Sequence, residues 1–153
     1  MSRGSVARWC MASLLVALCI WAINRAAHVG WASYQSIEAR LLVKRWNEQS
    51  LAFDQIAWNR AREGFVTALE WDPENPAYHE GFADLYLLRL QAVPVGRELS
   101  RPFVQLALKH YLKAAALRPT WPYTHASIAT AKFYLGEFDA DFEIGRASCR
   151  ERV

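Results

Sequence analysis

The stretch ALEWDPENPAYHEGFADLY, residues 68–86, decides the fold, because it recurs 46 positions later as AAALRPTWPYTHASIATAK, residues 114–132. Both copies alternate small and bulky apolar residues at three- and four-residue spacing around a P-x-x-P corner. This pattern is typical of two helices that meet at a tight turn. A helical hairpin cannot bury its apolar side alone, so a second copy predicts stacked hairpins. The repeat-packing signature comprises Ala61, Phe65, Ala68, Pro73, His79 and Phe82 in the first copy, and Ala107, Tyr111, Ala114, Pro119, His125 and Ile128 in the second.

Composition supports an all-α fold with a real core. The chain has 153 residues, of which 53% are hydrophobic, and it contains only seven glycines and six prolines. Its net charge of +3 is small and scattered, which argues against a nucleic-acid partner. The three cysteines, Cys10, Cys19 and Cys149, form neither a disulfide framework nor a metal-ligand spacing. Nucleotide-binding and nucleophile-elbow motifs are absent as well, so we expect no cofactor and no enzymatic activity.

The N-terminal segment, residues 1–31, is predicted to anchor the chain in a membrane. Residues 9–23 read WCMASLLVALCIWAI and carry no charge. Fifteen residues are short for a span, but three tryptophans are spaced as interfacial anchors and Arg25 can snorkel out of the apolar zone. A cleaved signal and a buried core helix are the alternatives. Positive charge before the run favours a single pass with the body on the far side of the membrane from the cytoplasm.

The body, residues 33–143, is predicted to be a helical repeat domain. An amphipathic helix over 33–48 is expected to bury Ile37, Leu41, Leu42 and Trp46. The remaining helices are expected at 55–71 with Asp54 as N-cap, 76–91, 101–117 with Ser100 as N-cap, and 122–135 with Gly136 as C-cap, with a loop over 92–101.

A further helix is expected to begin in GEFDADFE, after which the repeat pattern fails. Reverse translation of EIGRASCRERV, residues 143–153, resembles a library adapter sequence read in frame. We therefore expect residues 144–153 to be an artefact and the natural chain to continue past Glu143. An unstructured basic tail is the alternative.

Three residues at the second corner form a candidate contact site for a sugar or a partner protein. Arg118, Trp121 and Tyr123 would offer aromatic faces and a guanidinium group, which suit carbohydrate rings. The alternative, which we favour, is that Trp121 packs in the corner between the repeats.

Other polar residues are expected to be structural. His79 and His125 occupy equivalent repeat positions on different hairpins, which favours a packing role over metal binding or acid–base chemistry. The acidic run Glu137, Asp139, Asp141 and Glu143 is expected to be a solvated helix face.

The units resemble tetratricopeptide repeats, because Ala61-Phe65-Ala68-Pro73 and Ala107-Tyr111-Ala114-Pro119 supply that family's small–aromatic–small–proline spacing. The layout of an apolar segment followed by ALEWDPENPAYHEGFADLY and ALRPTWPYTHASIATAKFYLGEFDADF is also similar to VpsP-type exopolysaccharide-biosynthesis proteins of bacteria. The second resemblance covers about residues 10–142 and implies an accessory protein anchored in the inner membrane, with a periplasmic body and no catalytic residues.

The apolar segment and the helical repeats predict a membrane-tethered scaffold. The resemblance to VpsP-type proteins implies that it holds protein components of a polysaccharide synthesis or export machinery. The alternative function is a carbohydrate-binding protein that holds the nascent polymer through Arg118, Trp121 and Tyr123.

Overall fold

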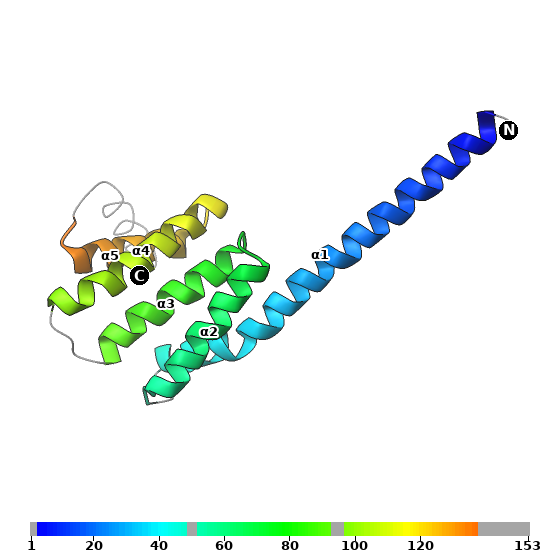
Figure 1. Ribbon diagram of the computed structural model, residues 1–153. Helices are drawn as coiled ribbons and strands as arrows, with labels where there is room; N and C mark the ends of the chain where they lie inside the picture. Colours follow the sequence, from blue (N-terminus) through cyan, green and yellow to red (C-terminus); the bar gives the residue numbers. More distant parts are fainter. Residues whose placement is uncertain (1–2, 49–51, 93–96, 138–153) are drawn as a thin grey trace.

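A computed structural model of the chain describes residues 3–48, 52–92 and 97–137 (Figure 1). These residues form helices and turns, which confirms the all-α prediction. The helices are α1 (Arg3–Asn47), α2 (Gln55–Trp71), α3 (Pro76–Ala92), α4 (Arg97–Leu117) and α5 (Pro122–Leu135).

The N-terminal anchor segment and the amphipathic helix form one continuous helix, α1, of 45 residues. Its N-terminal half projects out of the bundle, and its C-terminal half lies against α2 (Figure 1). Within Met11–Asn47 lies an 18-residue window that is long and apolar enough to cross a membrane, and none of that window is buried. A role as a buried core helix is therefore wrong for this segment.

The buried face of α1 differs from the predicted one. Ala32, Ser36, Ala39 and Val43 are buried together with Trp46, whereas Ile37 and Leu41 are 48% and 51% exposed. The reason is the close approach of α2. A Cβ atom at Gly64 would lie 2.8 Å from the backbone carbonyl oxygen of Gln35, so there is no room for a side chain where the two helices cross at this position.

The two hairpins, α2/α3 and α4/α5, bury the small and bulky residues of the repeat. Phe65 and Tyr111, at equivalent positions, are both essentially inaccessible to solvent. Alanines flank each of them and are also buried: Ala61, Ala68, Ala107 and Ala114. Phe82 and Ile128 fill the corresponding positions of the second helices. The apolar stripes of the hairpins therefore cover one another.

Local capping residues set the start of α2 and the end of α5. Asp54 accepts hydrogen bonds from the backbone N–H groups of Ile56 and Ala57, at 3.0 and 3.2 Å. Gly136 ends α5 in the left-handed conformation, with φ of 77°.

The start of α4 was predicted wrongly. The helix begins at Arg97, so Ser100 lies inside it and does not cap it, and Pro102 also lies inside. Arginine, glutamate and leucine at positions 97–99 favour helix, and these residues extend α4 by one turn before the proline.

Antiparallel packing brings both P-x-x-P corners to the same end of the bundle. The corner between α2 and α3 and the corner between α4 and α5 both lie at the end from which the free half of α1 projects (Figure 1). This corner end is the part of the body nearest to the apolar segment.

Candidate interaction surface

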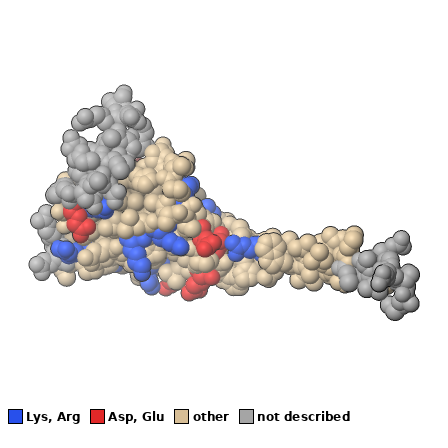
Figure 2. All heavy atoms as spheres, turned by 90° about the horizontal axis from the view of Figure 1, so that it is seen from above, with Lys and Arg blue, Asp and Glu red and all other residues tan. Residues whose placement is uncertain are grey.

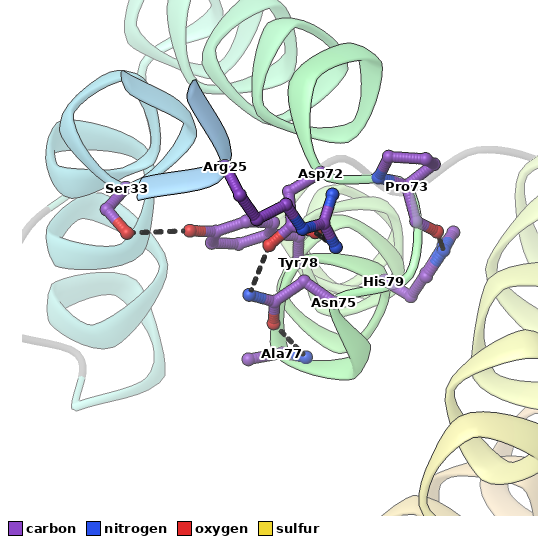
Figure 3. A network of polar contacts seen from close by, with 8 residues as sticks. All are labelled: Arg25, Ser33, Asp72, Pro73, Asn75, Ala77, Tyr78 and His79. Atoms are coloured by element: carbon purple, nitrogen blue, oxygen red, sulfur yellow. Dashed lines mark hydrogen bonds and ion pairs between the residues drawn. The ribbon is translucent and has the colours of Figure 1, made fainter. Parts of the chain in front are cut away.

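The junction of α1 with the first corner is held by polar and aromatic contacts. The Arg25 guanidinium lies 3.9 Å from the Asp72 carboxylate, and the Ser33 and Tyr78 hydroxyl groups share a hydrogen bond of 2.9 Å (Figure 3). The His28 ring meets the edge of Trp71 at a centroid distance of 4.9 Å. These contacts fix the corner against the part of α1 that directly follows the apolar run.

Each repeat histidine fastens its own corner. His79 Nε2 lies 2.9 Å from the carbonyl oxygen of Pro73, and His125 Nε2 lies 2.8 Å from that of Pro119. A carbonyl oxygen only accepts, so in both residues the Nε2 atom carries the proton. The two histidines therefore play the same structural role at equivalent positions, although His79 is buried and His125 is half-buried.

His79 also pairs with His110 of α4. The two Nδ1 atoms are 2.9 Å apart. Because neutral His79 is protonated on Nε2, its Nδ1 accepts, and His110 must donate from its own Nδ1–H. This chain from His110 through His79 to Pro73 joins the two hairpins.

Burial keeps both rings of this pair neutral. Desolvation, followed by the charges of His79 and Lys109, lowers the pKa of His110 to about 4. Desolvation also lowers the pKa of His79, against an upward effect of its bond to Pro73, and the charge of Lys113 adds to the lowering. The histidine pair is thus a structural contact that requires an unprotonated Nδ1 on His79, in surroundings that disfavour an added proton on either ring.

A second polar cluster lies between α3, α4 and α5. Glu80 accepts from the Arg118 guanidinium at 2.7 Å and from the Thr124 hydroxyl. One turn along α3, Asp84 accepts from the Tyr111 hydroxyl at 2.5 Å. Burial raises the pKa of Asp84 above its usual value, while the bond from Tyr111 opposes that shift.

Both carboxylates of this cluster are occupied by protein donors, which gives them a structural role at the interface between the hairpins. Among the described residues, no group of three or more histidine, cysteine, aspartate or glutamate side chains is arranged to hold a metal ion.

The structure brings the three candidate contact residues together. The Arg118 guanidinium lies 4.3 Å from the centre of the Trp121 ring, and the Trp121 and Tyr123 rings are 5.3 Å apart. Trp121 is 39% exposed and Tyr123 is 54% exposed. Trp121 therefore packs against Arg118 and Tyr123 at the corner, and part of its ring stays open to solvent. We call these three residues the corner platform.

A second exposed apolar feature runs along the outer side of α1. Tyr34, Ile37 and Leu41 are all exposed and follow one another at three- and four-residue spacing, so they share one helix face. We call these three residues the outer stripe. The sequence indicated an apolar face here, but it placed that face in the core.

Several polar residues of these networks are not evident from the sequence. His110, Glu80, Asp84 and Thr124 contact partners that are 27 to 44 positions away. The four-residue separation of Glu80 and Asp84 within the repeat was the available signal, because it puts both carboxylates on one face of α3. Glu137 is exposed, while Asp139, Asp141, Glu143 and residues 144–153 lie outside the described residues.

No protein-family model matches this chain, and no protein of curated function is significantly similar to it.

Proposed function

We propose that this chain is a membrane-tethered helical module that holds protein components of a polysaccharide synthesis or export machinery. The observation that carries the tether is the division of α1. Its apolar window is entirely outside the bundle, whereas the same unbroken helix contributes Ala32, Ala39 and Val43 to the core. An unburied apolar helix of this length is stable in a bilayer and unfavourable in water.

The scaffold role is supported by the form of the body. Stacked helical hairpins present long, rigid surfaces to partner proteins. The outer stripe is the best partner surface on the described residues, because an exposed apolar face at helical spacing suits a partner helix or groove. The link to exopolysaccharide comes from the resemblance of the sequence to VpsP-type proteins and remains a proposal.

Loss of the gene tests the pathway. We expect deletion to reduce secreted polysaccharide and wild-type protein to restore it. A chain that lacks residues 9–23 should fail to restore it and should leave the membrane fraction. Unchanged polysaccharide after deletion would contradict the assignment to this pathway.

Substitution of the outer stripe tests the scaffold role. The double variant Ile37→Ser, Leu41→Ser removes apolar side chains from a solvent-exposed surface, so folding should be preserved. We expect this variant to be present at the wild-type level and with the wild-type helix content, but to fail to restore polysaccharide in the deletion strain. The matched control is Leu112→Ser, since Leu112 is also exposed but lies on α4. Equal complementation by both variants would exclude the outer stripe as the partner surface.

A further inference from the structure

We infer that the corner end of the bundle rests on the lipid headgroup layer of the membrane that holds α1, with the corner platform in contact with lipid. This inference rests on the proposed membrane tether. It commits to lipid as the occupant of the platform, in place of a carbohydrate.

The position of Arg25 limits how far along α1 the membrane can extend. Ile23 closes the uncharged run, and Arg25 already contacts Asp72 of the body. A folded corner that carries charged groups cannot enter the hydrocarbon, so the apolar core of the bilayer stops near Arg25. Seventeen helical rises separate Arg8 from Arg25, about 26 Å, which approaches the roughly 30 Å thickness of a hydrocarbon core.

The distance along α1 from the end of the apolar run to the first corner is short. His28, which contacts Trp71, lies five helical rises beyond Ile23, or about 7.5 Å along the axis. The headgroup layer on each side of a bilayer is roughly 5–8 Å thick. The first corner is therefore placed at the outer boundary of the headgroups, and Trp71, 40% exposed, can reach into them.

The continuous helix α1 also fixes the orientation of the bundle relative to the membrane. The described part of α1 is continuous from Arg3 to Asn47, and its buried face from Ala32 to Trp46 fixes the bundle to it. With no break between the two halves, the bundle cannot turn its corner end away from the bilayer. The second corner lies at the same end as the first (Figure 1).

The chemistry of the corner platform suits this position. Tryptophan and tyrosine favour the membrane interface, where their rings meet apolar carbon and their polar groups meet water. The Arg118 guanidinium lies against the Trp121 ring and is paired with Glu80 at 2.7 Å, so it supports the ring, and the platform meets lipid through its aromatic side chains.

The charges at the first corner indicate which kind of lipid headgroup this end of the bundle can contact. Figure 2 shows basic and acidic side chains gathered where α1 leaves the bundle, and Glu70 and Glu74 are exposed at this corner. These carboxylates oppose binding to strongly anionic lipid, so contact should occur on a zwitterionic surface.

Site-specific quenching in vesicles tests the inference. The 153-residue chain, with Cys10 and Cys149 replaced by serine, is reconstituted in phosphatidylcholine and labelled with a fluorophore at one cysteine. The native Cys19, exposed on α1, reports on the tether with an acyl-chain quencher. In a Cys19→Ser background, Thr120→Cys reports on the second corner and Arg101→Cys serves as the distant control. Both host positions are exposed.

We expect a headgroup-attached quencher to act about twofold or more strongly at position 120 than at position 101, since the two lie on the order of 25 Å apart along α4. Equal quenching at both positions, with Cys19 still quenched from the acyl chains, would overturn the inference and leave the tether intact. Failure of quenching at Cys19 would overturn both. A probe at position 120 that responds to added polysaccharide, and not to the headgroup quencher, would assign the corner platform to carbohydrate instead.

Discussion

At the scale of single residues, buried polar pairs join the hairpins, and their protonation states matter. The contact between His79 and His110 requires an unprotonated Nδ1 on His79, and burial disfavours an added proton on His110. The pair lies beside Phe82, whose ring centre is 4.7 Å from that of His110. Two lysines nearby, Lys109 and Lys113, further disfavour a proton on the pair. Acid should therefore weaken the interface between α3 and α4.

His110→Asn tests this pH dependence. The folded pKa of His110, about 4, lies below its ordinary value of 6.5, so the unfolded chain takes up the proton first. The stabilising effect is complete above about pH 6.5 and is lost as the pH falls toward 4. Because asparagine can still donate to His79 and does not titrate, the free energy of unfolding of the wild type should fall by about 1 kcal/mol more than that of the variant between pH 7 and 5, after allowance for solvent around the half-buried ring.

The measurement is chemical denaturation in detergent micelles, followed by circular dichroism at several pH values. The difference between the two proteins isolates His110, because Asp84 titrates in both of them. Parallel pH profiles for wild type and variant would show that the pair does not control acid stability.

Tyr111→Phe tests the second buried contact. The phenol donates to Asp84, so its removal leaves a buried carboxyl oxygen without this donor and should lower the free energy of unfolding by about 1–3 kcal/mol. Tyr134→Phe is the matched control, since Tyr134 is exposed and should change stability by less than about 0.5 kcal/mol. Equal unfolding midpoints for the two variants would argue against a stabilising role for the contact.

At the scale of elements, the close contact between α1 and α2 decides which face of α1 is buried. Gly64 permits that contact, because any side chain there would meet the backbone of Gln35. Ala39 lies beside the same point and is buried. The absence of bulk at this crossing is what turns Ile37 and Leu41 outward.

Gly64→Ala should therefore force α1 away from α2 and cost about 1–3 kcal/mol of unfolding free energy, despite the better helix propensity of alanine. Gly30→Ala is the control, because a Cβ atom there meets nothing within 4 Å. Unfolding followed in detergent gives both values. A stabilised Gly64→Ala variant would mean that the two helices are more loosely packed than described.

The sequence predicts elements well where their signals are local. The bounds 55–71 and 122–135 match the structure, because Asp54, Pro122 and Gly136 act on their own helix ends. The buried face of α1 could not be predicted, since it depends on a glycine in another helix. The three residues of the corner platform lie within one short segment, so the sequence could bring them together. His79 and His110 come from two different helices, so their contact could not be predicted.

At the scale of the whole molecule, the continuous helix α1 connects the proposed anchor rigidly to the body. A flexible insertion of four glycine and serine residues between Asn24 and Arg25 breaks α1 while leaving the contacts of Arg25 and His28 with the first corner in place. Quenching by headgroup label at position 120 should then fall toward the level at position 101, while quenching at Cys19 from the acyl chains should persist. Unaltered quenching at position 120 would show that the corner platform binds lipid without help from a rigid α1.

The unbroken course of α1 has a mechanical consequence. A helix that must match its apolar length to the bilayer tilts when the bilayer becomes thinner. In the proposed tether, the body is fixed to the C-terminal half of this same helix. It must therefore swing through the same angle, and the outer parts of the bundle travel farthest. Local bilayer thickness would thereby set the height and direction at which a bound partner is held.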